Sequence, residues 1–297
     1  MRYFLSLFFT VSVLFAGVLD TWHQKIEDFF GNTIERLDKF LSESNESVSQ
    51  KYSLETSLRV FTESKKAGSG YKFNITSKIP LPRTEKKLYL FLQDFKRTTS
   101  VDEQSGNNIR DSIDNNSYLL GLFFKPKSKL KYRAGIRFHT ITPDPFAGVV
   151  FHDMVQFDQK NRLEYGDSLY YYLDRKLDNT LYANYIYHIN SAQYFAFENS
   201  YRYIQEPNKE HQILDSFKLY TTLNKKRFVI PSFQVYSTAN QKRSYHLDYI
   251  YLGCTYHDTI LRPWLFYEVA PAVLFREINN FQASYRVDFT VGITFSK

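Results

Sequence analysis

The clearest pattern in the chain is the alternation of apolar and polar residues from 281 to 295, F-Q-A-S-Y-R-V-D-F-T-V-G-I-T-F. Every odd position from Phe281 to Phe295 is apolar, and every even position is polar or glycine. Successive side chains of a β-strand point to opposite faces, so the pattern predicts a strand with one apolar and one polar face. Soluble strands usually have about five or six residues, whereas about 9–11 tilted residues cross a bilayer. The stretch is therefore typical of a wall between lipid and water.

Similar alternating segments, separated by turn-rich gaps, follow one another from Lys51 onward. They predict a closed antiparallel transmembrane β-barrel of about fourteen strands, an even number as expected for a single-chain bacterial barrel. The predicted strands lie near residues 52–60, 71–79, 86–96, 117–125, 129–141, 147–158, 162–173, 180–189, 193–204, 211–223, 227–237, 244–256, 263–276 and 281–295. Strands 86–96, 147–158 and 211–223 are the least regular, so twelve strands is the alternative. A soluble β-sandwich is the other alternative, which the number of such segments disfavours.

Short turns and longer gaps alternate between these strands. If the last strand ends at the periplasm, the periplasmic turns are 80–85, 125–129, 158–161, 189–192, 223–227 and 257–262. The longest gap, 97–116, then lies outside the cell. Thr142-Pro143-Asp144-Pro145 is interpreted as a turn that leads into strand 147–158, because proline interrupts the hydrogen-bond ladder of a sheet.

The first fifty residues predict export and one helix. Residues 1–17 contain Arg2 and then a short apolar run that ends in small residues, as a cleaved signal peptide does. Residues 18–50 are expected to form a periplasmic or plug helix and a linker, followed by the barrel domain 51–297. The helix, near 20–44, has an apolar stripe that favours packing on the barrel rim or on a periplasmic partner over plugging the lumen. The stripe consists of Trp22, Ile26, Phe29, Phe30, Ile34, Leu37 and Leu41.

Composition agrees with a barrel more than with a soluble protein. Tyr and Phe number 24 and 27, so that 18% of the residues are aromatic, as two interfacial girdles would require. The mean hydropathy of −0.42 is low, but a barrel hides its apolar face behind alternating polar positions. A single cysteine, Cys254, excludes an internal disulfide bond.

The signal peptide, the repeated amphipathic strands, the last strand and the segment R-P-W-L-F-Y-E-V-A-P-A-V at 262–273 together carry a resemblance. In these features the chain resembles bacterial outer-membrane β-barrel proteins, and in particular an uncharacterised porin-like family. The resemblance implies a Gram-negative outer membrane and contact with its lipids. It also implies that the last strand is recognised by the barrel-assembly machinery, although Ser296 and Lys297 follow the final aromatic residue. The implied assembly signal comprises Tyr285, Phe289, Val291, Ile293 and Phe295.

The charged residues at inward positions of the predicted strands define a candidate lumen. Cross-strand pairing, such as that of Arg286 and Asp288 with Glu268, would hold the register, whereas unpaired charges would select ions. Arg133 and Arg137 have no acid at the predicted neighbouring inward positions, so they are the candidate selectivity pair. The predicted inward set is Glu55, Arg59, Lys72, Lys78, Lys131, Arg133, Arg137, Glu164, Glu198, Arg202, Asp248, Glu268, Arg286 and Asp288. Basic residues outnumber acidic ones in this set by eight to six, which favours anions weakly.

Candidate catalytic residues are sparse. The paired Ser and His spacing that an outer-membrane phospholipase needs is missing, although His139 and His152, near Asp144 and Asp153, could form an acid–base cluster. The sequence has no nucleotide-binding motif or zinc spacing, and it predicts neither a cofactor nor nucleic-acid binding. Asp153 is anomalous, because the alternation aims it at lipid. We expect a bulge, a shifted register or a position near the membrane interface there.

Three functions remain open on the sequence alone. The first is a narrow porin-like channel for small solutes with a weak anion preference. The second is a non-conducting structural or adhesion barrel, favoured by bulky predicted inward residues, namely Phe228, Ile250, Trp264 and Phe266. An outer-membrane hydrolase is a weaker third, so the chain is not predicted to be an enzyme.

Overall fold

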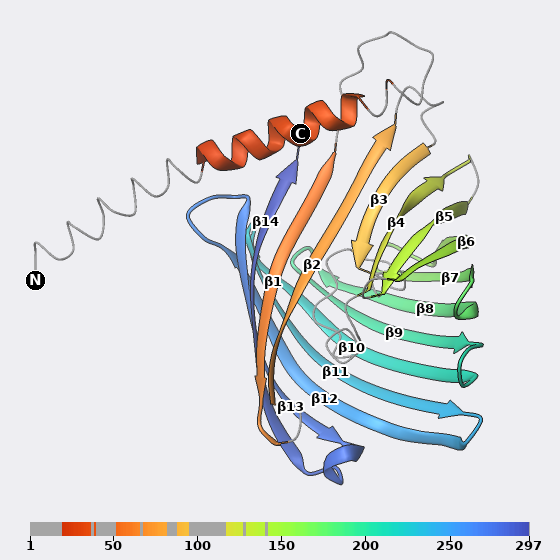
Figure 1. Cartoon of the computed structure of the whole chain (residues 1–297). Helices are drawn as coiled ribbons and strands as arrows, with labels where there is room; N and C mark the ends of the chain where they lie inside the picture. Colours follow the sequence, from red (N-terminus) through yellow and green to blue (C-terminus); the bar gives the residue numbers. More distant parts are fainter. Residues whose placement is uncertain are drawn as a thin grey trace, which may run out of the picture.

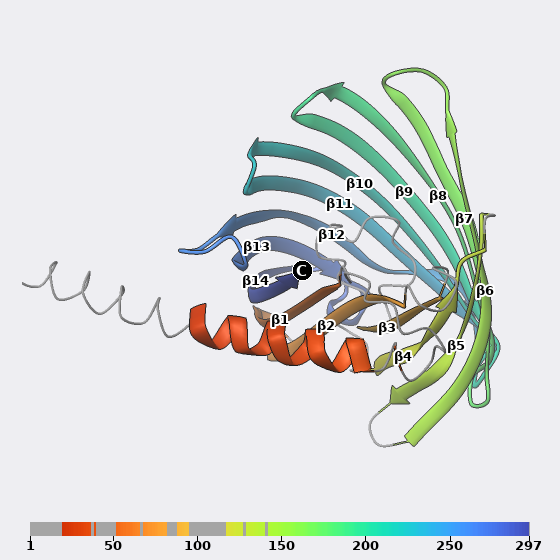
Figure 2. The same ribbon diagram turned by 90° about the horizontal axis from the view of Figure 1, so that it is seen from above.

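The computed structural model is a closed barrel of fourteen antiparallel strands with one helix beside it (Figures 1 and 2). It describes residues 20–36, 39, 52–65, 68–81, 88–94, 117–126, 129–139 and 142–296. The predicted count of fourteen is confirmed and the alternative of twelve is wrong. The predicted signal peptide and the whole of the predicted long loop, 97–116, lie outside the described residues. The strands are β1 (Ser53–Glu63), β2 (Gly68–Leu81), β3 (Leu88–Asp94), β4 (Ser117–Phe124), β5 (Leu130–His139), β6 (Thr142–Gln156), β7 (Asn161–Tyr172), β8 (Lys176–Asn190), β9 (Gln193–Ile204), β10 (Glu210–Asn224), β11 (Arg227–Asn240), β12 (Arg243–Thr259), β13 (Leu265–Arg276) and β14 (Ala283–Ser296).

Each strand pairs with its neighbours in sequence, and β1 closes the ring by pairing with β14. The closing pair is in continuous register from Ser53 opposite Ser296 to Glu63 opposite Arg286. Closure leaves no unpaired strand edge that could recruit other chains. The end of the barrel where β1 begins and β14 ends is called the helix rim below, since the helix lies there (Figure 1).

The alternating residues of each strand form two different surfaces of the barrel, one inner and one outer. Along β4, Leu119 and Phe123 are buried on the inner side, whereas Leu120, Leu122 and Phe124 are exposed on the outer side. Large apolar residues are exposed on the outside of most other strands too, as a barrel surrounded by lipid requires. Among the described residues, no helix is both long and apolar enough to cross a membrane.

The strand β6 begins earlier than the sequence predicts. Thr142-Pro143-Asp144-Pro145 is not a turn, because Pro143 pairs with Phe138 and Pro145 with Ile136 on β5. On its other side β6 pairs with β7 only from Phe146 onward. Both prolines therefore lie where β6 pairs with a strand on one side alone, although the carbonyl of Pro145 accepts a hydrogen bond from the N–H of Leu173 at 3.2 Å. A missing N–H costs little at such a position.

A bulge on β12 changes the face of Ile250, which was predicted to point inward. Tyr236 pairs with Tyr249 but Ser237 pairs with Leu247, so Asp248 is an extra residue on β12. The insertion exchanges the two faces of the strand. Tyr249 and Tyr251 consequently point inward and are buried, and Ile250 points outward, contrary to the prediction.

Asp153 does point outward, and no bulge or register shift accompanies it. It lies three residues before the end of β6, close to the helix rim. Its carboxylate accepts hydrogen bonds from Lys129 and from the hydroxyl of Tyr165, the latter at 3.2 Å. Of the three explanations, the position near the interface is the one that the structure supports.

The N-terminal helix, residues 20–36, packs on the outside of the barrel and not in its lumen (Figure 2). Its buried side chains His23 and Ile34 lie against outward residues near the rim ends of β1, β2 and β14. The ring of His23 lies between those of Trp264 and Phe295, with centroid distances of 4.3 and 4.6 Å. Rim packing is thus confirmed for the described part of the helix. Trp264 belongs to this contact and does not narrow the lumen.

Candidate functional site: the charged and aromatic lumen

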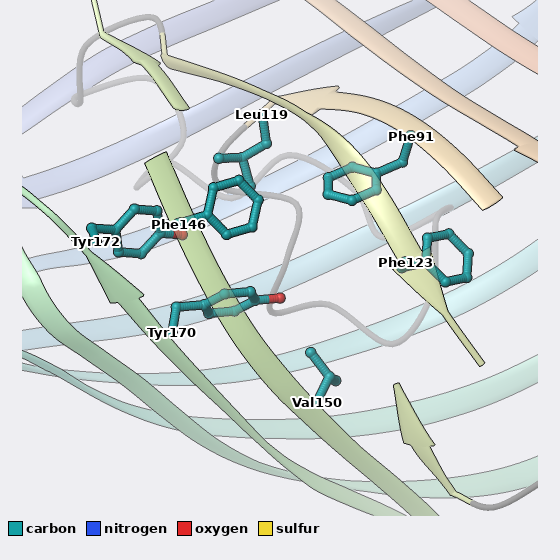
Figure 3. Close-up of a cluster of buried hydrophobic side chains, with 7 residues drawn as sticks. All are labelled: Phe91, Leu119, Phe123, Phe146, Val150, Tyr170 and Tyr172. Carbon is teal, nitrogen blue, oxygen red and sulfur yellow. The ribbon is translucent and has the colours of Figure 1, made fainter. Parts of the chain in front are cut away.

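A cluster of aromatic and aliphatic side chains covers the inner wall from β3 to β7 (Figure 3). Phe91 on β3 and Phe146 on β6 lie 6.4 Å apart between ring centroids, although two strands separate them. The strands between them approach closely at Gly121 and Gly135, where a methyl group on Gly135 would lie 2.2 Å from the carbonyl oxygen of Leu120. The cluster comprises Phe91, Leu119, Phe123, Phe146, Val150, Tyr170 and Tyr172.

Two predicted lumen cations lie over this cluster. The guanidinium of Arg133 lies 5.2 Å from the ring centre of Phe91, and its Nη1 donates a hydrogen bond to Tyr170 at 3.1 Å. The ammonium of Lys78 lies 5.7 Å from the ring centre of Tyr89. Both cations also lie within 6 Å of the ring of Phe123. Aromatic faces attract cations but leave their net charge in place, so this wall stays positive.

Arg137, the second member of the predicted selectivity pair, is neutralised. Its Nη2 donates a hydrogen bond to Oδ2 of Asp144 at 2.6 Å, and Asp174 lies at 3.4 Å. The side chains of Arg137 and Asp144 are 1% and 5% exposed. The prediction that no acid lies beside Arg137 is wrong, because Asp144 belongs to β6 directly opposite it and not to a turn.

Other predicted lumen charges are also paired, largely with residues that the sequence analysis missed. Arg202 donates two hydrogen bonds to Asp178, at 2.7 and 2.5 Å. Lys218 donates to Glu198 at 2.7 Å. Asp178 was missed because β8 begins at Lys176, within a predicted gap. Lys218 could have been found from the sequence, because it shares the alternation of β10 with the other even-numbered residues, which point inward.

The last strand carries a four-membered charge cluster. Arg286 donates from Nε and Nη2 to Asp288, each at 2.7 Å, and its Nη1 lies 3.4 Å from Glu63. Glu63 also accepts two hydrogen bonds from Arg276, at 2.9 and 2.8 Å. Glu63 was missed because the first strand extends three residues beyond its predicted end.

Glu268 does not join this cluster, contrary to the expected pairing with Arg286. It lies opposite His257 on β12, whose Nδ1 is 3.2 Å from Oε1 of Glu268. The ring of His257 lies between Phe228 and Phe266, at 4.2 and 5.2 Å between centroids, on the inner wall near the helix rim. These two phenylalanines therefore narrow the lumen as predicted.

In the part of the chain that the structure describes, the inward charges without an oppositely charged partner are mainly basic. Among the described residues, no acid lies within ion-pair distance of Arg59, Lys78 or Arg133, whereas the inward acids Asp144, Asp178, Glu198 and Asp288 all have basic partners. Glu164 likewise pairs with Arg162 at 2.7 Å. Lys72 is buried on the inner face of β2, and Glu55 and Lys131 occupy inward positions of β1 and β5.

The predicted acid–base cluster on the hairpin of β5 and β6 does not form around His152. Its Nδ1 lies 2.8 Å from the hydroxyl of Tyr182 on the inner side, whereas Asp153 points outward. Asp144 is engaged by Arg137, eight residues away along β6. The side chain of His139 lies outside the described residues. Within the described part, no carboxylate lies within hydrogen-bond distance of His152.

One group of side chains has the spacing of a metal site. Ligand atoms of His246, Asp248 and Glu277 lie within 4.8 Å of one another at the rim opposite the helix. His246 Nε2 is 3.3 Å from Asp248 and 3.7 Å from Glu277. Arg243, however, donates hydrogen bonds to both carboxylate oxygens of Glu277. The group is accounted for as an ion-pair network, in which Asp248 is the bulge residue of β12.

The five residues of the predicted assembly signal all lie on the outer face of β14. Tyr285 and Phe289 are exposed there, as lipid-facing residues would be. Phe295 differs, since it is buried under the helix by the ring of His23. The last aromatic residue thus contacts protein where the sequence alone suggests lipid.

No protein-family model matches the sequence, and no curated protein matches it either. Solved structures of porins and channels do resemble it. The NanC porin is 8% identical with a TM-score of 0.42, over 81% of this chain and 98% of that one. The outer membrane channel DcaP of Acinetobacter baumannii is 7% identical with a TM-score of 0.48, over 83% and 96%. OmpT of Vibrio cholerae is 10% identical with a TM-score of 0.43, over 86% and 100%. At such values the likeness is one of general barrel architecture.

Proposed function

We propose that the protein is a narrow porin-like channel of a bacterial outer membrane that passes small solutes and prefers anions. The observation that carries the preference is the positive inner wall, where Arg59, Lys78 and Arg133 have no acidic partner among the described residues. A low-dielectric wall strengthens the field of unpaired charges and concentrates counter-ions in the lumen.

The location rests on the two walls of the barrel. A closed sheet with exposed apolar side chains outside and charged side chains inside is stable where lipid surrounds it, because every backbone polar group is paired within the ring. In the proposed orientation the helix rim faces the periplasm. The apolar residues 1–17 act as a cleaved export signal in this proposal.

The narrowness rests on the inward aromatic residues. The cluster from β3 to β7 is nearly fully buried, and Tyr249, Tyr251 and Leu274 form another buried cluster on the inner side of β12 and β13. Such filling also favours the second candidate, a non-conducting structural barrel. The two functions differ in whether a continuous path of water crosses the lumen.

Liposome swelling tests the proposal. Proteoliposomes that hold the full chain should swell faster in a small carboxylate solute than in a quaternary ammonium of the same size, and a larger sugar polymer should enter neither. Empty liposomes give the baseline. Equal rates for the anion and the cation would contradict the preference, and swelling no faster than that of empty liposomes would favour the non-conducting barrel.

A further inference from the structure

The N-terminal helix has a second apolar face that the barrel does not cover. Trp22 and Phe29 are 56% and 66% exposed, and none of the described strands packs over them. They are seven residues apart, so at 3.6 residues per turn they lie on the same side of the helix and about 10 Å apart. Exposed large aromatic residues on a helix whose opposite side is already packed indicate a further partner.

The contacts of the helix show in which direction this face points. Asp20 and Glu27 are on the side toward the end of the barrel, where Asp20 contacts Arg262 and Glu27 accepts a hydrogen bond from the backbone N–H of Ser296. On the other side, Ile26 and Phe30 pack against the same outer cluster as Ile75, Leu90 and Ile293, which lie farther along the wall. Helical geometry places Trp22 and Phe29 next to Ile26 and Phe30. The exposed aromatic face therefore continues the lipid-facing surface of the barrel.

The charged residues of the helix are also divided between two sides, with cations beside the exposed aromatic face and acids away from it. Lys25 lies three residues from Trp22 and four from Phe29, and Arg36 lies seven from Phe29, so these two exposed cations border the aromatic face. The acids Asp20, Glu27, Asp28 and Glu35 lie on the other side of the helix. Aromatic residues flanked by cations on one face, with acids on the opposite face, are typical of helices that lie in the headgroup region of a bilayer.

We propose that the helix is an interfacial membrane helix that binds phospholipid beside the barrel, in the leaflet at the helix rim. Trp22 and Phe29 insert at the boundary of the acyl chains, and Lys25 and Arg36 bind lipid phosphates. The inference rests on the proposed membrane location of the barrel and not on its conducting solutes. The helix thereby fixes the depth of the barrel at this leaflet, across the seam where β1 meets β14.

Tryptophan fluorescence of the full chain in lipid vesicles tests this contact. The chain has two tryptophans, so a Trp264→Phe variant leaves Trp22 as the reporter and keeps an aromatic ring beside His23. In phosphatidylcholine vesicles with phosphatidylglycerol, the emission of Trp22 should be blue-shifted, quenched by brominated acyl chains and little quenched by aqueous iodide. The double variant Lys25→Gln/Arg36→Gln should lose the part of the blue shift that depends on phosphatidylglycerol. The matched variant Lys160→Gln/Lys226→Gln, with both changes in turns at the same rim, should retain it.

Strong iodide quenching with no effect of brominated lipid would overturn the proposal, and would leave a periplasmic protein as the partner of this face. Equal shifts with and without phosphatidylglycerol would overturn the role of the two cations. Strand-rich circular dichroism and heat-modifiable migration confirm that each variant is folded in the vesicles. Swelling rates measured on the same vesicles report the channel separately, so failure of either proposal can be distinguished from failure of the other.

Discussion

The guanidinium of Arg137 lies 2.6 Å from the carboxylate of Asp144, directly across the pairing of β5 with β6 and buried on the inner wall. The pair removes one of the two charges that the sequence suggested for ion selection. It leaves Arg133, four residues away on the same strand, as an inward cation with aromatic neighbours and, among the described residues, no acid within ion-pair distance. Selectivity is therefore expected from Arg133 together with Lys78.

Replacing Lys78 and Arg133 together by Gln should move the reversal potential in a salt gradient toward that of cations. The reason is that the substitution removes two uncompensated positive charges from the lumen and adds none. The variant Lys160→Gln/Lys226→Gln removes the same charge from turns outside the lumen and should leave the potential unchanged. An equal shift in both variants would show that net charge and not the lumen wall sets the preference.

Breaking the Arg137–Asp144 pair should destabilise the barrel. Removal of one partner from a buried ion pair costs about 3–5 kcal/mol, because the other charge stays buried. Asp144→Asn and Arg137→Gln should each lower the urea midpoint of unfolding in detergent, and the double variant should lose less than the sum. Fully additive losses would mean that the two side chains do not interact.

Phe295→Ala should reduce the amount of folded protein in the membrane more than Lys297→Ala. The aromatic ring completes the predicted assembly signal, and it also forms the surface on which His23 stacks. Heat-modifiable migration of membrane fractions measures the folded amount. Equal amounts of folded protein from the two variants would contradict the role of the ring.

Acid should loosen the start of the helix from the barrel. Hydrogen bonds from Arg262 hold the pKa of Asp20 below its usual value. A lowered pKa in the docked state means that the contact stabilises docking above the ordinary pKa near 3.8 and is lost as the pH falls below it. Protease cleavage near residue 20 after exposure to pH 3 should rise relative to pH 7. In the Asp20→Asn variant, cleavage at pH 3 should rise much less above its pH 7 level than in the unmodified chain. If cleavage rises equally in both proteins, groups other than Asp20 are responsible.

The sequence was sufficient to predict the barrel because its strands have one apolar and one polar face, and this alternation survives in nearly every strand. It also predicted the rim position of the helix, since a stripe that includes Ile26, Phe30 and Ile34 needs an apolar surface to cover, although Trp22 and Phe29 of the same stripe stay exposed. The predicted strand bounds were wrong where local residue preferences disagree with the strand pairing of the sheet. The two prolines at 143 and 145 indicate a turn, yet both are accommodated in the part of β6 that lacks one neighbour.

It was harder to predict which residues pair with the lumen charges than to predict which charged residues point inward. Pairing depends on register, and a register can be shifted by one inserted residue such as Asp248. Glu63 and Asp178 lie beyond the strand ends that hydrophobic periodicity predicts, because alternation weakens where a strand leaves the membrane. Which cations remain unpaired therefore emerges only when the strands are aligned.

Deleting residues 18–50 should leave the conductance unchanged. The described part of the helix lies against the outer wall, so it does not obstruct the lumen. A plug would give the opposite result, since its removal would raise the conductance of each channel. Recording the full chain and the deletion variant in the same lipid distinguishes the two arrangements, and strand-rich circular dichroism checks that the variant is folded.

Single-channel recording of the full chain in a planar bilayer tests the central claim most directly. With a tenfold potassium chloride gradient, small discrete conductance steps should appear, and the zero-current potential should have the sign of chloride selectivity. If the folded barrel inserts and gives no conductance steps, the lumen has no continuous path of water. The channel function would then be wrong, and the non-conducting barrel would take its place.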